Sequence, residues 1–330
     1  MTLGWGIIGP GGIAQSAMAP AIAADPNSHL AAVVSRDQGR ADEFAQKHGA
    51  TWAGTDYEAM LARPDVDVVL ITTPNAQHAA QAISAARAGK HVLSDKPLAG
   101  SAEEAQQVID ACAAAGVKLG LNFQTRHHAC FQEARRVIAS GAIGDVVVVQ
   151  IDAGNGGRPP GGWRLDPNLA GLGAVNNIAV HIYDVLRFLL GSEVTEVAAM
   201  FETGQKPAIE LCPMVLMRFA NGAMAYANGN QLTAKPLDEI VIHGTKGRID
   251  GRGVTRPGQD GEMRVVTESS ETTEHYTSRD AYQRTVAAFS QAILDGREPN
   301  PSGLDGLRSV QLTDAIARSV RESKVVPVSS

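Results

Sequence analysis

A glycine-rich segment near the amino terminus has the residue types and spacing of a phosphate-binding turn. It reads Gly9-Pro10-Gly11-Gly12-Ile13-Ala14, directly after an apolar run typical of a buried strand and directly before a helical pattern. In such a turn the first glycine permits a tight bend, the second lets a pyrophosphate approach the backbone, and the small third residue lets the helix pack closely on the strand. The segment from Gly9 to Ile13 is therefore predicted to bind a dinucleotide, whose charge the helix N-terminus stabilises. The alternative is a glycine-rich turn that binds no ligand.

The residues after the second predicted strand bear on the choice between NAD and NADP. NAD-binding proteins usually have an acid there, about 20 residues after the glycines, which bonds the ribose 2′-hydroxyl. This chain has Ser35 and Arg36, with Arg40 close behind, and Asp37 comes one or two residues late. Because arginine forms charge-assisted and often bidentate bonds with phosphate, we expect NADP(H) to be preferred, while NAD(H) stays open. The alternative for Arg36 is a solvated surface charge.

Small polar residues follow the strongest strand pattern in the chain, which lies at residues 66–73. In an open parallel sheet, the carboxyl ends of the strands face the ligand crevice. We therefore expect this segment to contact the dinucleotide. The residues concerned are Thr72, Thr73, Pro74, Asn75 and, one turn into the next predicted helix, His78.

The segment 88–99 carries a more specific motif. It reads AGKHVLSDKPLA and resembles the signature AGKHVL-x-EKPLA of the glucose–fructose oxidoreductase, inositol dehydrogenase and rhizopine-catabolism family, with Asp95 where Glu is commoner. Residues 64–67, 73–75 and 243–247 are similar to the same family, so the resemblance covers essentially the whole chain. Residues 162–165 and 180–188 are similar to a subgroup of NADPH-dependent sugar reductases within it. The resemblance implies redox chemistry on a sugar, polyol or keto-sugar.

The motif lysine of this family falls on Lys96. The resemblance implies that its amine contacts the substrate oxygen and the nicotinamide ribose, and that a cis-proline follows. The chemistry agrees, because a cation near the oxygen stabilises the negative charge that hydride transfer creates there. A partly desolvated lysine can also share in proton transfer. Without the motif, Lys96 would be read as a surface residue at a turn. Asp95, beside it, and Asn122, at the end of the last strand of this half, are expected at the cofactor or substrate.

A second catalytic group is implied by the family's D-x-x-x-H motif, which falls on Asn177 and His181. Residues four apart on a helix share one face, and the histidine has the pKa range that proton transfer needs. Asn177 departs from the family's Asp, and an amide cannot pair ionically with an imidazolium. Either His181 is therefore less basic than in relatives, or Asn177 bonds a substrate hydroxyl instead. Asp184, one turn beyond His181, could orient the ring in place of Asn177. The alternative for His181 is a hydrogen-bonded helix histidine without a catalytic role.

Trp163 and Arg164 follow a Gly/Pro-rich stretch at residues 154–162. By the subgroup resemblance they cover the nicotinamide or bind substrate, and the alternative is a packed Trp beside a surface Arg. The run Arg126-His127-His128 suggests a metal site only superficially, because adjacent helix residues point in different directions and no partner has ligand spacing. No metal is predicted.

Strands and helices alternate regularly in the first 122 residues. We interpret this part of the chain as a dinucleotide-binding Rossmann domain with a doubly wound parallel sheet. Residues 123–330 are interpreted as an α+β domain for substrate binding and oligomerisation, with an open, mainly antiparallel sheet. Its C-terminal segment can return to the first domain. The predicted strands are 3–9, 29–35, 66–73, 91–94, 117–122, 146–151, 194–202, 210–219, 223–230, 239–243 and 247–250, with 324–328 pairing at a sheet edge. The predicted helices are 12–24, 38–48, 76–88, 102–115, 127–140, part of 172–190, 282–294 and 307–321.

Composition excludes several classes of protein. The 330 residues carry a net charge of −6 with no basic stripe, which argues against nucleic-acid binding. No apolar run approaches the roughly 20 residues of a membrane helix, and the N-terminus lacks the features of a signal peptide, so the cytoplasm is expected. Cys112, Cys130 and Cys212 form no CxxC pair and are interpreted as small core residues.

These observations predict an NADP(H)-dependent oxidoreductase for a small carbohydrate-like substrate, with Lys96 and His181 handling the oxygen and the proton. The open sheet predicts a homodimer or homotetramer. Two alternatives remain. One is an enzyme that keeps its dinucleotide tightly bound and uses transient oxidation for elimination or glycoside cleavage. The other is a dinucleotide-binding sensor without catalysis, which Asn177 would favour.

Overall fold

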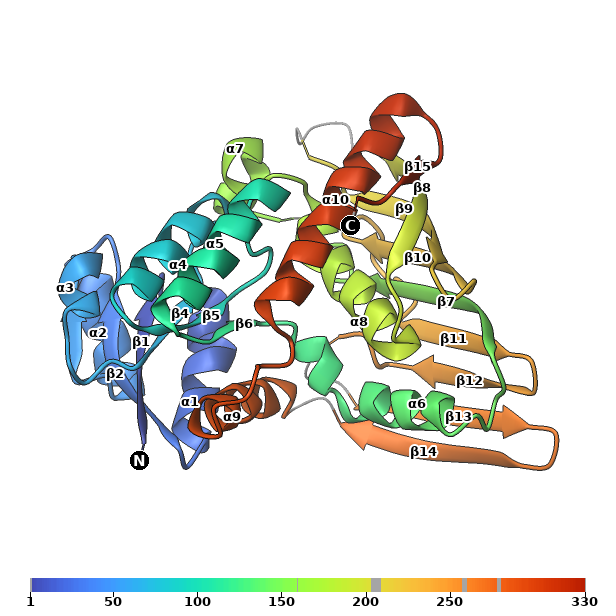
Figure 1. Ribbon diagram of the computed structural model, residues 1–330, viewed down its shortest axis with the longest axis horizontal. Helices are drawn as coiled ribbons and strands as arrows, with labels where there is room; N and C mark the ends of the chain where they lie inside the picture. Colours follow the sequence, from blue (N-terminus) through green and yellow to red (C-terminus); the bar gives the residue numbers. More distant parts are fainter. Residues whose placement is uncertain (1, 159, 203–208, 257–259, 278–279, 330) are drawn as a thin grey trace. The chain divides into compact units, whose positions relative to one another are not determined.

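The computed structural model describes residues 2–158, 160–202, 209–256, 260–277 and 280–329 (Figure 1). The chain forms two compact units. The first consists of Met1–Phe123 together with Tyr282–Val310, and the second of Gln124–Ala281 together with Gln311–Ser330. A segment from the C-terminal third therefore contributes to the first unit.

The first unit is built on a six-stranded parallel sheet in the order β3-β2-β1-β4-β5-β6. The chain starts in the middle of this sheet, moves outward to β3, and returns to β4 on the other side of β1. Such a reversal creates a crevice at the carboxyl ends of β1 and β4, where dinucleotides bind. The predicted doubly wound Rossmann fold is confirmed. The strands are β1 (Leu3–Ile8), β2 (Ser28–Val34), β3 (Trp52–Gly54), β4 (Val68–Ile71), β5 (His91–Ser94) and β6 (Leu119–Leu121).

Short-range signals set the helices of this unit. Asp37 and Ser101 cap α2 and α5 by accepting hydrogen bonds from the amides of Arg40 and Glu104. Gly116, just after α5, has a φ of +68° and ends that helix in the left-handed conformation. The helical elements are η1 (Ala14–Met18), α1 (Ala19–Ala24), α2 (Gln38–His48), α3 (Tyr57–Leu61), η2 (Asn75–Gln77), α4 (His78–Arg87), α5 (Ala102–Ala115) and α9 (Ala281–Leu294).

Helix α9 packs against the first sheet. The ring of Phe289 lies edge-on to Trp5 with centroids 5.9 Å apart. A Cβ atom at Gly120 in β6 would lie 2.6 Å from the Phe289 ring, so glycine is needed there for the close approach. The hydroxyls of Ser28 and Ser290 are 2.9 Å apart and hydrogen-bonded. The return of the chain to this unit is therefore held by both packing and polar contacts.

The second unit contains a nine-stranded sheet in the order β14-β13-β12-β11-β7-β10-β9-β8-β15. Only the β7–β10 pair among these described strands is parallel, so the predicted open, mainly antiparallel sheet is confirmed. The final strand pairs with the edge strand β8, as predicted. The strands are β7 (Val146–Gly154), β8 (Val194–Glu202), β9 (Cys212–Phe219), β10 (Met224–Asn230), β11 (Glu239–Gly244), β12 (Gly247–Arg252), β13 (Asp260–Thr267), β14 (Glu271–Thr277) and β15 (Val326–Pro327).

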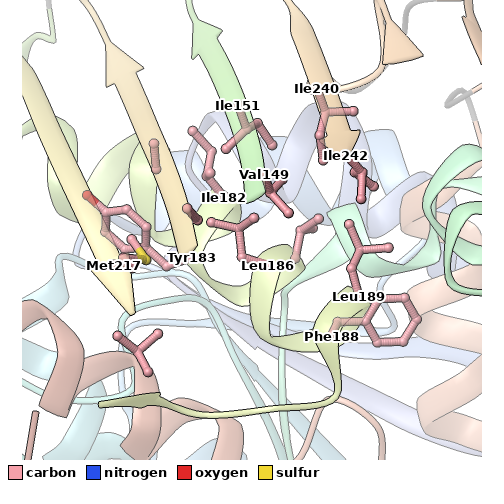
Figure 2. Close-up of a cluster of buried hydrophobic side chains, with 14 of the residues drawn as sticks. Val149, Ile151, Ile182, Tyr183, Leu186, Phe188, Leu189, Met217, Ile240 and Ile242 are labelled. Carbon is pink, nitrogen blue, oxygen red and sulfur yellow. The ribbon is translucent and has the colours of Figure 1, made fainter. Parts of the chain in front are cut away.

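One face of this sheet is covered by apolar helix residues (Figure 2). Leu186 in α8 is fully buried and belongs to the same cluster as Val149 in β7 and Ile242 in β11. Burying each such side chain contributes about 1.5–3 kcal/mol. The helical elements of this unit are η3 (Gln124–His127), α6 (Ala129–Ala139), η4 (Gly162–Leu165), α7 (Pro167–Ala170), η5 (Val175–Ala179) and α8 (Val180–Leu190), and α10 (Gly303–Glu322) crosses from the first unit into the second.

One stretch, Pro167–Leu190, is long and apolar enough to cross a membrane by length and composition alone. The sequence expectation of no such run was therefore too strict. Since 67% of the most apolar part of this stretch is buried inside the protein, it behaves as the core helix of the second unit.

Candidate active site

The glycine-rich turn lies between β1 and η1 at the switch point of the first sheet. Gly9 has a φ of +84°, and a Cβ atom there would lie 2.8 Å from Thr73 Cγ2 and 2.9 Å from the Thr73 amide nitrogen. The fold itself therefore requires glycine at this position. The turn is closed by a 2.7 Å hydrogen bond from the Gly11 amide to the Gly9 carbonyl. Ala14 is fully buried, as close packing of the helix on the strand demands.

Gly11 and Gly12 differ from Gly9 in what surrounds them. A Cβ atom at Gly11 would meet only the Gly9 oxygen at 3.8 Å, and one at Gly12 would meet no described atom within 4 Å. Neither residue has a φ that disfavours side chains. The protein thus leaves open space above this backbone, at the N-terminus of a helix, which suits a pyrophosphate. The residues present therefore fit a dinucleotide.

The tip of β2 presents the two predicted arginines. Asp37 is engaged as the N-cap of α2, where its Oδ1 accepts a 2.8 Å hydrogen bond from the amide of Arg40. Ser35 is buried, and its hydroxyl accepts a 3.3 Å hydrogen bond from the amide of Asp37. Arg36 and Arg40 are exposed, and in the described part of the chain neither guanidinium pairs with a carboxylate. Two uncompensated cations therefore lie beside the strand end.

The turns after β4 and β5 are tied together by His78. This residue is 1% exposed, its Nδ1 lies 2.7 Å from the carbonyl oxygen of Pro97, and its Nε2 lies 2.9 Å from that of Thr73. Thr72 donates its hydroxyl to the Gly9 carbonyl at 2.8 Å. The hydroxyl of Thr73 is hydrogen-bonded to Gln81 Oε1 at 2.6 Å. Sequence reasoning missed Gln81, although its position one turn after His78 was a usable signal.

The Lys96–Pro97 peptide bond is cis, which confirms the bond that the family resemblance implied. Asp95 Oδ1 accepts a hydrogen bond from the Lys96 amide at 3.0 Å and a long one from Asn122 Nδ2 at 3.4 Å. Asn122 is buried and its amide bonds the carbonyl of Ser94 at 2.8 Å. The structure thus brings the predicted residues of the first unit to one edge of its sheet. They follow β1, β2, β4, β5 and β6.

In the second unit, Asn177 lies on η5 and His181 on α8. Both side chains are half-buried, and most of the residues next to them in the sequence are buried. The η5 element is one turn of π-helix, as is η1 beside the glycine-rich turn. Such turns are frequent at functional sites. The Asn177 amide donates to the Gly173 carbonyl at 3.0 Å.

Asp184 lies in a buried ion network of the same unit. Both of its oxygens accept 2.6 Å hydrogen bonds from the guanidinium of Arg126, and Arg187 approaches to 3.8 Å. The side chain of Asp184 is 0% exposed. These contacts favour a structural role, and its suggested contact with the His181 ring stays a prediction. No local pattern indicates the pairing with Arg126, which lies 58 positions away in the sequence.

Trp163 and Arg164 lie on η4 in the second unit, half-buried, with the Arg164 guanidinium stacked 4.5 Å from the Trp163 ring centre. The loop before them packs closely against the loop after β10: a Cβ atom added at Gly157 would lie only 2.9 Å from Ala234 Cα. Across residues 2–158, 160–202, 209–256, 260–277 and 280–329, no group of three or more His, Cys, Asp and Glu side chains could hold a metal ion. His128, for example, caps α6 by accepting from the amide of Cys130.

Comparison with known proteins gives consistent matches along the chain. The model of an oxidoreductase family with an NAD-binding Rossmann fold, GFO/IDH/MocA, matches residues 3–123, and that of the GFO/IDH/MocA C-terminal domain matches residues 131–250. The 1,5-anhydro-D-fructose reductase of Ensifer adhaerens is 31% identical, with 98% of each chain covered. The D-xylose 1-dehydrogenase (NADP(+)) 2 of Haloferax volcanii is also 31% identical, again with 98% of each covered. The aldose-aldose oxidoreductase of Caulobacter crescentus, solved with glycerol, has a TM-score of 0.92 at 29% identity, covering 99% of this chain and 100% of its own.

Proposed function

This chain belongs to the GFO/IDH/MocA oxidoreductase family, and from that premise we propose that it transfers a hydride between NADP(H) and a sugar, polyol or keto-sugar. The observation that carries the proposal is the open backbone at Gly11 and Gly12, on the same sheet edge as Lys96. The names of two relatives, the 1,5-anhydro-D-fructose reductase and the D-xylose 1-dehydrogenase, describe reactions on an anhydro-sugar and a sugar. The second name also includes NADP(+).

The preference for NADP(H) rests on the tip of β2. Arg36 and Arg40 supply cations for a 2′-phosphate, and the carboxylate of Asp37 is bonded to the α2 amide. Ser35→Asp would place an acid where NAD-binding proteins have one. We expect this variant to weaken NADPH binding at least tenfold and to improve NADH binding, as measured by isothermal titration calorimetry. A wild-type protein that binds NADH more tightly than NADPH would refute the assignment.

We assign the chemistry to Lys96 and His181, the two groups that the family motifs single out. When bound, the nicotinamide supplies or accepts the hydride. The ammonium of Lys96 stabilises negative charge on the substrate oxygen, and His181 exchanges the proton with that oxygen. Asn177 bonds a substrate hydroxyl. The remaining predicted residues at the strand ends, with Trp163 and Arg164, hold the dinucleotide.

The test is NADPH oxidation with 1,5-anhydro-D-fructose and NADP⁺ reduction with D-xylose, followed at 340 nm. We expect Lys96→Met and His181→Asn each to lower kcat about 10²–10⁴-fold. Lys47→Met, at an exposed position in α2, is the matched control and should leave kcat unchanged. Stoichiometric dinucleotide that copurifies without net turnover would favour the tightly bound alternative. Binding without any turnover over a broad polyol and keto-sugar panel would favour the sensor.

We also propose a homo-oligomer that uses the outer face of the second sheet. Met200, Met214 and Leu216 are 77%, 49% and 58% exposed, and Met200 lies directly opposite Met214 on the neighbouring strand. Exposed apolar side chains that adjoin one another on a protein surface mark interaction sites. A cytoplasmic location stays a prediction that cell fractionation would test.

A further inference from the structure

One buried carboxylate, in the segment before β9, holds the start of the helical run formed by η5 and α8. Glu210 Oε2 accepts a 2.7 Å hydrogen bond from the amide of Gly173, and its Oε1 accepts a 2.8 Å bond from the amide of Val175. The carbonyl oxygen of Glu210 accepts a 2.9 Å bond from the amide of Ala174. Three consecutive amides are therefore bonded to a single residue that is distant in the sequence.

This arrangement solves a general problem of helix starts. The first amides of a helix have no acceptor within the helix, and a negative charge there is stabilised by the helix dipole. Helices α2 and α5 take their caps from the adjacent residues Asp37 and Ser101. The η5 run takes its cap from Glu210, which is 3% exposed. Burial raises the pKa of Glu210, and the hydrogen bonds from the amides act in the opposite direction.

Close backbone packing holds the same π turn at both ends. A Cβ atom at Gly173 would lie 2.2 Å from the Glu210 carbonyl oxygen, so only glycine permits the contact. At the other end, a Cβ at Gly229 in β10 would lie 2.6 Å from the Cβ of Ala179. The turn between these two contacts carries Asn177.

We propose that Glu210 is a positioning residue for the reaction, because it fixes the backbone from which Asn177 and His181 project. This inference rests on the proposed function, since it has meaning only if those side chains act on the substrate. A displacement of about 1 Å at a reacting group can cost about 100-fold in rate. Loss of the clamp should therefore lower kcat strongly, and it should leave NADPH binding by the first unit intact.

The test compares Glu210→Gln with Asp25→Asn in the full-length protein. Glutamine is nearly isosteric but places an NH₂ group against one of the two amides. Asp25 is the matched control: it is also a buried acid, 6% exposed, and it accepts hydrogen bonds from Ser28 Oγ and the Asn27 amide at the start of β2. For Glu210→Gln we expect hydrogen–deuterium exchange of residues 173–179 to accelerate at least tenfold, kcat with NADPH and 1,5-anhydro-D-fructose to fall 10- to 100-fold, and the NADPH Kd to stay within twofold. The control should change neither the exchange of 173–179 nor kcat.

For a wild-type protein that turns over substrate, two outcomes would overturn the inference. Unchanged exchange at residues 173–179 would refute the clamp, and accelerated exchange with kcat within twofold of wild type would refute the positioning role. If Glu210→Gln does not fold, Gly173→Ala disrupts the same contact from the other side. Glu210→Asp keeps the carboxylate and should therefore retain more of the wild-type kcat than Glu210→Gln or Gly173→Ala. A wild-type protein without turnover on any substrate would overturn the proposed function and the positioning role together, whereas the exchange data would still report on the clamp.

Discussion

Removing the charge of Asp184 should separate a structural role from a catalytic one. The side chains of Asp184 and Arg126 are 0% and 6% exposed, and they form a bidentate pair with two 2.6 Å hydrogen bonds. Breaking a buried ion pair from one side costs about 3–5 kcal/mol, because the charge that stays behind loses its bidentate partner. Arg187 also has Glu193 as a partner at 2.6 Å, so the penalty of Asp184→Asn falls mainly on Arg126.

The assay is urea unfolding followed by circular dichroism. With a denaturant slope of about 2–3 kcal/mol per molar urea, a loss of about 3–5 kcal/mol lowers the midpoint by about 1–2.5 M. Arg126→Met should lose a similar amount. The double variant Arg126→Met/Asp184→Leu should lie within about 2 kcal/mol of wild type, because an apolar replacement leaves no buried charge behind.

Kinetics on the same variant completes the test. If Asp184 only stabilises the fold, kcat of the folded Asp184→Asn protein at 20 °C stays within about twofold of wild type. If Asp184 orients the His181 ring, kcat falls about 10- to 100-fold, as for other groups that orient a catalytic side chain. The reasoning would be refuted if the free energy of unfolding of each single variant lay within 1 kcal/mol of the wild-type value. It would also be refuted if the loss in the double variant equalled the sum of the two single losses.

Two further predictions concern other parts of the molecule. Met200→Glu/Leu216→Glu should lower the mass measured by light scattering after size-exclusion chromatography, and Leu294→Glu in α9, 38% exposed, should not; an unchanged mass in the double variant would place the interface elsewhere. Burial lowers the pKa of His91, whose Nδ1 accepts a hydrogen bond from the Lys118 amide at 2.9 Å. The unfolded chain therefore binds the proton more readily, so this contribution to stability is present above pH 6.5 and is lost as the pH falls below it. Thermal midpoints measured from pH 8 to pH 5 should fall less steeply for His91→Gln than for wild type, and parallel curves would contradict the assignment.

Elements with a strong periodic pattern could be predicted from the sequence closely. The bounds of α2, α5 and β8 agree with the prediction at both ends. The strand β3 and the helix α3 were missed, because segments of three and five residues carry too little periodicity. The strands β13 and β14 were also missed. Nearly all of β14 is exposed, so its seven polar-rich residues show no alternation between apolar and polar positions.

The candidate site was predictable to the extent that its residues follow strands. In a parallel sheet, position after a strand fixes the edge on which a side chain lies, so Thr72, Lys96 and Asn122 could be placed together. Their supporting contacts could not be predicted in this way. The partners of His78 are backbone carbonyls, which every residue type supplies, and Glu210 lies 37 positions from the amide of Gly173 that it bonds. Such contacts depend on the tertiary packing, which no local pattern encodes.

The glycines show how the structure separates requirements of the fold from requirements of a ligand. At Gly9 and Gly173 an added Cβ would collide with backbone atoms of this chain, so the fold alone accounts for glycine. At Gly11 and Gly12 neither a neighbouring atom nor the backbone conformation accounts for it. Where the backbone conformation suits alanine equally well, glycine costs about 0.4–1 kcal/mol, because it leaves the unfolded chain more conformational freedom. We infer that a ligand which comes close to the backbone from outside offsets that cost, and the ligand that we propose at this edge of the sheet is the pyrophosphate of a dinucleotide. Accordingly, Gly12→Ala should keep or slightly raise the thermal midpoint while weakening NADPH binding, and a variant that gains stability with an unchanged NADPH Kd would remove the main support for the site.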